Sequence, residues 1–188
     1  MQQGRITINF PDGSRSEELE VPASKANQDI QAAGRVELII VPNSTAAQPT
    51  PSLSLINQVE NFIRDRCIST LDLFVTEPDW VEVTVRATLV PRSLDVADAA
   101  KTAALQALTR FLHPLMGGPT GQGWSFGRRP HTSDLYAVLE AIAEIDHVTT
   151  LTISSIPGLG DDPTVTPLPS DRLNRFLIYS GEHEVDLL

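Results

Sequence analysis

The residues of this chain that could do chemistry are concentrated between Phe111 and Pro130, in the run FLHPLMGGPTGQGWSFGRRP. The run holds five glycines, three prolines, one of the two tryptophans and two adjacent arginines. Glycine permits backbone angles that other residues avoid, and it lets other atoms approach the main chain closely. The composition predicts a shaped, ordered loop that binds a small molecule, a nucleic acid or another protein.

Phosphate binding is the first chemistry to consider, because Gly118 and Gly123 have the G-x-x-x-x-G spacing of a nucleotide-binding loop. Such a loop continues with lysine and then serine or threonine, whereas this chain has Trp124 and Ser125. A phosphate loop also follows a strand, and this one follows an expected helix. Gly121, Gly123 and Gly127 do not have the G-x-G-x-x-G spacing of a dinucleotide-binding loop. We therefore predict no nucleotide binding.

Protein binding is the second chemistry, because two aromatic residues precede a basic pair in this loop. Trp124 and Phe126 with Arg128 and Arg129 have the composition of interface hot spots. The arginines could clamp a carboxylate-rich partner surface, or they could be a solvated pair; both interpretations stay open. We expect both aromatic side chains to be covered by the core or by a partner. The glycines expected to shape this interface loop are Gly118, Gly121, Gly123 and Gly127.

The remaining reactive residues do not form a catalytic set or a metal site. None of the histidines lies at metal-ligand spacing from another histidine or from Cys67, which we expect to be a buried hydrophobe. His113 is expected to cap the C-terminal end of a helix, and His183 to lie on a solvated edge strand rather than in a weak cation site. Asp161 and Asp162 lack calcium-loop spacing. No metal, cofactor or catalytic residue is expected.

Composition narrows the possible partners. The chain has 188 residues, a net charge of −10 and a pI of about 4.7. This charge argues against nucleic acid and against an anionic membrane surface, both of which attract basic proteins. The start of the chain lacks a signal-peptide pattern, and one cysteine excludes an internal disulfide, so cytoplasmic synthesis is expected.

The elements around the loop are the clearest in the sequence. Alternation from Trp80 to Val90 predicts a strand of a sheet that is covered on one side only. A helix capped by Asp95, with Asp98 in its first turn, should lead into the loop, and a helix capped by Thr132 or Ser133 should leave it. The expected buried stripes are Val96, Ala100, Ala104, Leu108, Phe111 and Leu112 on the first helix, and Leu135, Val138, Leu139 and Ile142 on the second.

The other elements complete an α+β fold: a two-layer mixed β-sheet with helices packed on one face and long Pro/Gly loops. Two divisions are expected, an N-terminal hairpin and linker over 1–33 and a C-terminal domain over 34–188. The expected segments are a hairpin of Ile6–Phe10 and Glu17–Val21 around Pro11-Asp12-Gly13, a linker at Pro22–Ala33, a buried strand at Val36–Val41, a helix from a Thr50 cap to near Cys67, a strand at Val148–Ser154, an exposed loop at Pro157–Ser170, a strand at Arg172–Tyr179, a tight turn at Ser180-Gly181 and an edge strand at Glu184–Leu188.

Several segments together resemble the baseplate J-like family, the wedge proteins of contractile phage tails and phage-tail-like injection particles. The segments are GRVELIIVP (34–42), PSLSLINQVENFIRDR (51–66), VTEPDWVEVTVRATLVP (75–91), the loop at 111–130 with the helix after it, and RFLIYSGEHEVDLL (175–188). Their order carries the likeness, together with the motif G-G-x-x-G-x-G-W-x-F-G-R from Gly117 to Arg128. It is nearest to the extracellular injection-system branch.

This resemblance implies a non-enzymatic subunit that joins neighbouring wedge proteins into a six-fold ring around the central spike and couples the ring to sheath contraction. The implied partners are wedge, sheath and spike or hub proteins, within a particle assembled after cytoplasmic synthesis. Family members are usually several times longer, and they have Gly-Val where this chain has Asp146-His147-Val148. The rival interpretations are a small-ligand or carbohydrate-binding module that uses the loop and Trp80, and an enzyme whose residues converge only in three dimensions.

Overall fold

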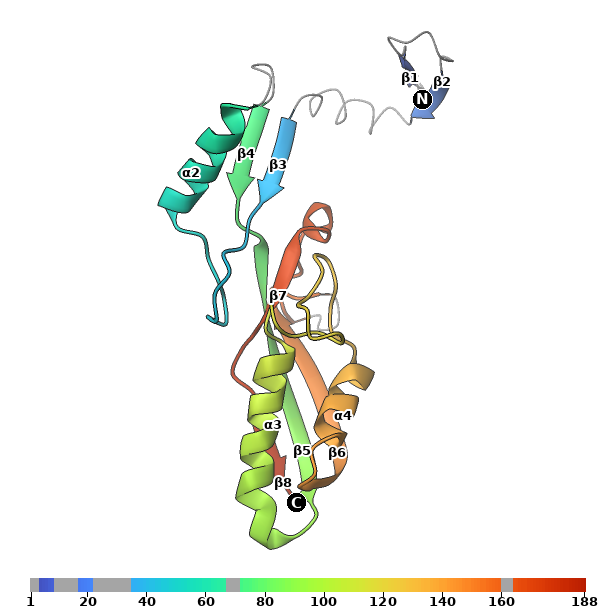
Figure 1. Cartoon of the computed structure of the whole chain (residues 1–188). Coiled ribbons are helices and arrows are strands. Elements are labelled where there is room, and N and C mark those ends of the chain that lie inside the picture. Colours follow the sequence, from blue (N-terminus) through green and yellow to red (C-terminus); the bar gives the residue numbers. More distant parts are fainter. Residues whose placement is uncertain (1–3, 9–16, 22–34, 67–71, 160–163) are drawn as a thin grey trace. The chain divides into compact units, whose positions relative to one another are not determined.

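The computed structural model describes residues 4–8, 17–21, 35–66, 72–159 and 164–188 (Figure 1). The chain forms two compact units, one of residues 1–38 and 57–75 and the other of residues 39–56 and 76–188. The division expected between residues 33 and 34 does not coincide with these boundaries. Cys67, Asp161 and Asp162 lie outside the described residues.

The first unit contains two small sheets. Strands β1 (Gly4–Ile8) and β2 (Glu17–Val21) pair antiparallel, which confirms the predicted hairpin; its Pro11-Asp12-Gly13 turn and the following linker lie outside the described residues. Strand β3 (Arg35–Ile39) pairs with β4 (Asp72–Thr76) in a two-stranded sheet. The expectation of a buried strand is wrong here, because Val36 remains 44% exposed and an apolar run does not reveal whether a second layer covers it.

Helix α2 (Leu53–Arg64), within which the two units divide, begins after Ser52. The Ser52 hydroxyl accepts a hydrogen bond from the Leu55 N–H at 3.2 Å. The predicted Thr50 cap is therefore wrong. Ser52 is closer to the helix, and its oxygen satisfies one of the amides that the first turn leaves unpaired.

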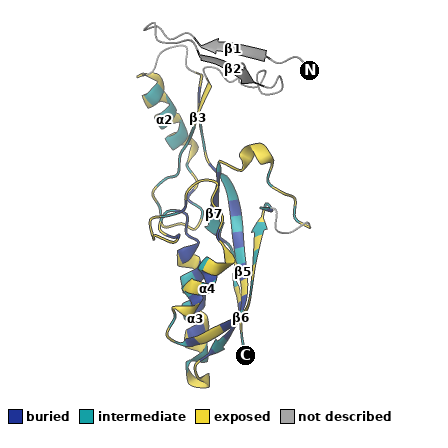
Figure 2. Ribbon diagram, turned by 90° about the vertical axis from the view of Figure 1, so that its right-hand side faces the viewer, coloured by how far each residue is buried: buried dark blue, intermediate teal, exposed yellow. Residues whose placement is uncertain are grey.

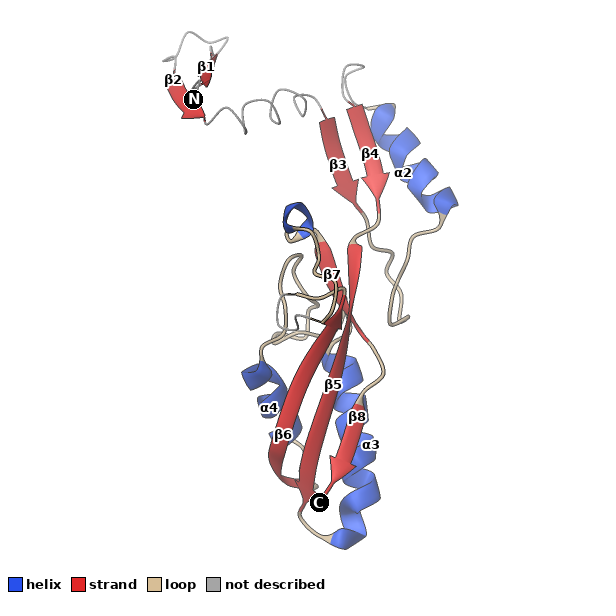
Figure 3. Cartoon of the chain, turned by 180° about the vertical axis from the view of Figure 1, so that it is seen from behind, coloured by secondary structure: helices blue, strands red, loops and turns tan. Residues whose placement is uncertain are grey.

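The second unit is organised on one long strand, β5 (Asp79–Pro91). It pairs antiparallel with β6 (Ile145–Ile156) on one side, and parallel with β7 (Phe176–Ser180) and then β8 (Glu184–Leu187) on the other, as Figure 3 shows. The predicted alternation is confirmed. The buried residues of β5 are Val81, Val83, Val85, Ala87, Leu89 and Pro91.

Two helices cover the same face of this sheet, α3 (Ala97–Phe111) and α4 (Thr132–Glu140) (Figure 2). The opposite face of β5 carries Glu82, Thr84, Arg86 and Thr88. The structure is thus an α+β fold with a mixed sheet, as predicted. Ala100, Ala104 and Leu108 of α3 are fully buried, which lets the helix lie close to the strands.

Both predicted caps of these helices are wrong. Asp95 lies in a 3-10 turn, η1 (Leu94–Val96), where a hydrogen bond from Ser93 lowers its pKa, and α3 continues directly from that turn. Helix α4 begins after His131 instead of Thr132 or Ser133, and the Asp134 carboxylate accepts the His131 N–H at 3.3 Å. At α3 the preceding 3-10 turn takes up the free amides, and at α4 a capping box between His131 and Asp134 does so, which moves each cap from the predicted residue.

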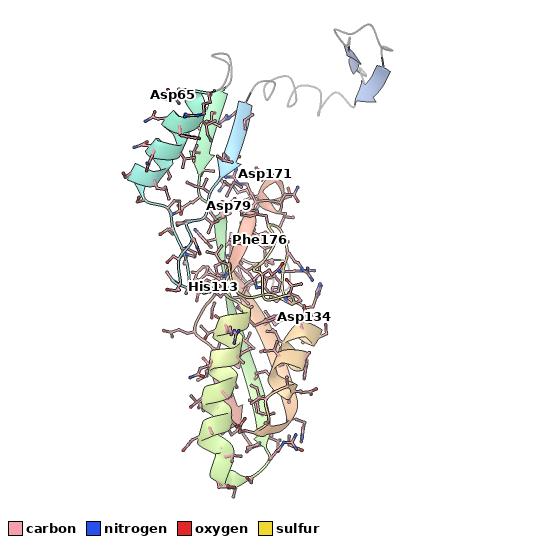
Figure 4. All side chains as sticks on the ribbon, in the orientation of Figure 1. Asp65, Asp79, His113, Asp134, Asp171 and Phe176 are labelled. Atoms are coloured by element: carbon pink, nitrogen blue, oxygen red, sulfur yellow. The ribbon has the colours of Figure 1, made fainter. Side chains whose placement is uncertain are left out.

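The segments on either side of η2 (Ser170–Arg172) also differ from the expectation. Part of the expected exposed loop is ordered by backbone hydrogen bonds from Gly158 to Thr166 and from Leu168 to Gly158, both 2.9 Å. Leu159 and Leu168 pack against the core. The strand begins at Phe176 instead of Arg172, since Arg172 and Arg175 hold Asp79 at 2.8 and 2.9 Å at the start of β5 (Figure 4).

The expected tight turn at Ser180-Gly181 is wrong, because β7 and β8 both run parallel to β5 and the chain continues in one direction. Val85 of β5 pairs with Ile153 of β6 on one side, but on the other side it lies between the residues paired with β7 and those paired with β8 and has no backbone partner. The His183 ring fills this gap: its Nδ1 accepts the Val85 N–H at 3.0 Å. His183 is half-buried, not on a solvated edge, and its burial lowers its pKa.

We expect this contact to make the free energy of unfolding depend on pH. The folded protein holds neutral His183, so as pH falls below about 6.5 the unfolded chain takes up the proton first and stability decreases. His183→Asn, whose side-chain oxygen can accept the Val85 N–H, should flatten this decrease between pH 7 and pH 5. Urea denaturation at several pH values measures it.

His147→Asn is the matched control, because it removes the same ring from an exposed position of β6. It should leave the pH slope close to that of the parent chain. Equal slopes in the parent and in His183→Asn would contradict the role assigned to the ring.

Candidate interaction surface

Trp124 is the centre of the glycine-rich loop. Its indole Nε1–H donates to the Phe111 carbonyl at 2.9 Å, and its ring meets the Phe111 ring edge-on at 5.4 Å between centroids. The side chain is 7% exposed and belongs to the core cluster, which confirms that it packs against the core. The loop is therefore anchored to the last turn of α3.

The loop backbone closes on itself around this ring. The five amides of this closure donate to carbonyls of the same segment: Gly117 to His113, Gly118 to Phe111, Gly121 to Gly118, Gly123 to Gly117 and Trp124 to Pro114, at 2.7–3.1 Å. A phosphate-binding loop instead aims its amides at the ligand. These amides are already occupied, which argues against a phosphate cradle in this loop.

His113 lies just after the end of α3 and bonds the start of the loop (Figure 4). Its Nδ1 accepts the N–H groups of Leu115 and Met116 at 3.1 and 3.3 Å, so the ring binds the amides that follow the helix. His113 lies at the C-terminal end of the helix, as expected. There its ring accepts hydrogen bonds from amides that follow the helix. Because Nδ1 accepts, the neutral ring carries its proton on Nε2.

Beyond Trp124 the loop turns outward. Phe126 is 44% exposed, so the core of this chain does not cover it, and its cover by a partner stays a prediction. The backbone on either side is held: the Gly127 N–H donates to the Phe176 carbonyl at 3.0 Å, and the Arg128 N–H to the Ser125 carbonyl at 3.2 Å. A large apolar side chain is thus presented on a fixed backbone. We call residues Phe126–Arg128 the loop tip.

The two arginines have different surroundings. The Arg129 guanidinium donates to the Leu159 carbonyl at 3.2 Å, which links the loop to the segment after β6. Arg128 is an exposed residue of the loop tip, as is Phe126. The sequence treated the two arginines as one pair, whereas in the structure Arg129 is bonded to the segment after β6.

Trp80 belongs to a separate cluster at the start of β5. Its Nε1–H donates to a Glu77 carboxylate oxygen at 3.3 Å, and its ring lies edge-on to Tyr179 at 6.2 Å. The Tyr179 hydroxyl donates to Glu82 at 3.1 Å, and burial together with that carboxylate raises the pKa of Tyr179. Because Trp124 is buried under the loop, the ligand-binding alternative is left with Trp80 as its tryptophan.

One pair with the composition of a nucleophile and its base was missed by the sequence reasoning. Ser180 Oγ lies 2.9 Å from His183 Nε2, and Ser180 is 8% exposed. In a catalytic pair the ring nitrogen accepts the serine proton. Here Nδ1 already accepts the Val85 N–H, so Nε2 carries the proton and donates to Ser180. The pair stabilises the fold and is oriented against activating the serine.

Comparison with known proteins gives no assignment. No family model matches the sequence. No curated protein matches it either. Within the described residues, no group of three His, Cys, Asp or Glu side chains is placed to hold a metal ion. In that same part of the chain, no helix combines the length and apolarity needed to cross a bilayer.

Replacing Trp124 should destabilise the second unit strongly. Trp124→Ala removes a buried ring and is expected to cost about 3–5 kcal/mol in the free energy of unfolding. Trp124→Phe keeps most of the apolar area and removes one of the two donors to the Phe111 carbonyl, which keeps the Gly118 N–H, so the cost should be about 0.5–1.5 kcal/mol. Trp80→Ala is the control. Chemical denaturation measures all three, and a Trp124→Ala variant as stable as the parent would show that the ring is not a core residue.

Two glycines of the loop separate backbone strain from crowding. Gly121 and Gly123 both have positive φ, of 69° and 91°. A Cβ on Gly121 meets nothing within 4 Å, whereas a Cβ on Gly123 lies 2.7 Å from the Pro114 carbonyl oxygen. Gly121→Ala should cost about 1–2 kcal/mol for the left-handed backbone alone. Gly123→Ala should cost about 1–3 kcal/mol more, and equal losses would mean that the loop closure relaxes.

Proposed function

We propose that this chain is a structural subunit of the baseplate of a contractile, phage-tail-like injection system, and that it acts by binding neighbouring subunits instead of by catalysis. In this proposal it joins wedge proteins around the central spike, in a six-fold arrangement that is coupled to sheath contraction. The likeness from Gly117 to Arg128 motivates it, together with the order of the other segments that resemble the baseplate J-like family.

The observation that supports the proposal most directly is that some residues of the glycine-rich loop anchor it to the core while others remain exposed. Trp124 and the hydrogen-bonded glycines anchor the loop, while Phe126 and Arg128 remain on its surface. An aromatic residue beside an arginine on a rigid backbone is the composition of an interface hot spot, because little entropy is lost when it binds. In this proposal, the motif from Gly117 to Arg128 holds the loop tip in position for binding a neighbouring subunit.

The surface beside the loop fits a protein partner better than a small molecule. An open apolar depression of about 750 Å³ lies between the loop and the outer side of α3. Met116 at its border is 47% exposed. The depression is lined by Leu105, Gln106, Thr109, Arg110, His113, Met116 and Gly121. Small-molecule sites usually enclose their ligand and add a few converging polar groups, whereas an open apolar area suits a protein surface.

The loop tip should be needed for assembly but not for folding. Phe126→Ser combined with Arg128→Ala removes the proposed hot spot, which is worth about 2–4 kcal/mol of binding, so incorporation into particles should fall about tenfold or more. The melting curve of the isolated chain should stay close to that of the parent. Particle yield by electron microscopy, with quantification of this chain in purified particles, measures the effect.

The matched control is Leu94→Ser combined with Lys101→Ala, since Leu94 is 89% exposed and Lys101 is an exposed cation on α3. This variant should assemble normally. Normal incorporation of the loop-tip variant would remove the tip from the interface, and the absence of this chain from any particle would overturn the proposed function itself.

A further inference from the structure

The two edges of the sheet in the second unit are built differently. The β7–β8 edge consists of short strands separated by Gly181–His183, and β8 carries Glu184 and Asp186. The β6 edge is one strand of 12 residues (Figure 3). Among the described residues, β5 is the only strand paired with β6, so every second residue of β6 directs its N–H and C=O outward, away from β5.

A register shift at Thr149 interrupts the pairing of β6 with β5, and from Thr150 to Ser155 the outer edge lacks the features that usually prevent strand addition. Its Asp and His residues, Asp146 and His147, are at one end, and the eight residues Val148–Ser155 read VTTLTISS, with no charge, proline or glycine. Natural proteins shield long edges with charged side chains, prolines, bulges or covering segments. In this sheet such shielding is found at the β8 edge, where Arg86 pairs with Glu184 at 2.6 Å, and not along the middle of β6.

A hollow of about 390 Å³ borders the same part of β6. On the strand it is lined by Leu151, Ile153 and Ser155, which share the helix-covered face with Val83, and by Thr152 and Ser154 of the opposite face. Because residues of both faces line it, the hollow reaches the backbone edge of the strand. Its far wall is formed by residues 129–132 and by Leu159.

We propose that the outer edge of β6 binds an extended strand of another protein chain, which pairs with its backbone and continues the sheet. The added strand would be uncharged over about six residues, since nothing on Val148–Ser155 would neutralise a buried charge. Every second side chain would be apolar and would enter the hollow beside Leu151 and Ile153, while the others would join the Thr and Ser residues of the open face. This binding does not depend on the baseplate role.

A library of random twelve-residue peptides displayed on phage, selected on the full chain, tests the proposal. The enriched sequences should alternate apolar and uncharged polar residues. Synthetic peptides from the enriched set are then N-methylated at every second residue, in the two possible phases. Methylation of the phase that faces β6 should weaken binding about tenfold or more, because several backbone hydrogen bonds are lost, and the other phase should leave binding unchanged.

Variants of the full chain locate the binding. Thr150→Lys with Thr152→Lys places charge on exposed side chains of β6 and should weaken peptide binding about tenfold or more. The variant also loses the hydrogen bonds of both threonines to β5, so binding is measured under conditions in which its unfolding curve shows it to be folded. Asp186→Lys on β8 is the control and should bind the peptides as the parent does. Failure to enrich alternating peptides, equal effects of the two methylation phases, or equal binding by the β6 variant would each overturn the proposal. The loop-tip variant should bind normally, which separates this surface from the proposed baseplate interface.

Discussion

The second unit depends on the complete pairing of β5. This strand pairs with every other strand of its sheet, and five of its buried side chains belong to the core on which α3 and α4 pack. An unpaired amide in such a position costs free energy comparable to a lost hydrogen bond. The imidazole of His183 is therefore a structural element, because it accepts the Val85 N–H where the chain passes from β7 to β8.

The glycine-rich loop is attached to the core of the second unit by two hydrogen bonds. Trp124 bonds the Phe111 carbonyl at the end of α3, and the Gly127 amide bonds the Phe176 carbonyl at the start of β7. Phe126 lies between these two anchors. The backbone at Phe126 is therefore fixed by hydrogen bonds on both sides, unlike that of an aromatic residue on a free loop. A fixed, partly exposed aromatic side chain loses little entropy on binding, which makes Phe126 suitable for recognition.

Several polar pairs in the second unit connect its strands and loops. Asp79, the first residue of β5, forms ion pairs with Arg172 and Arg175, and Arg129 links the loop to the Leu159 carbonyl. Ser180 and His183 are close enough for catalysis, but their hydrogen bonds run in the direction that stabilises the strands. These hydrogen bonds and ion pairs hold the loop and the strands of the second unit in place.

The sequence by itself determined the alternation of β5, the small buried stripe of α3, the hairpin and the burial of Trp124, because each depends on periodicity or on the cost of exposing a large ring. Only the tertiary structure decided which side chains cap α2 and α4, that β7 and β8 run in one direction, and that His183 serves as an acceptor. The caps are local, but several neighbouring residues could have supplied them. The strand directions and the role of His183 depend on partners far apart in the chain: the Val85 amide is 98 residues from His183, and a local pattern does not show which distant residue will lie beside it.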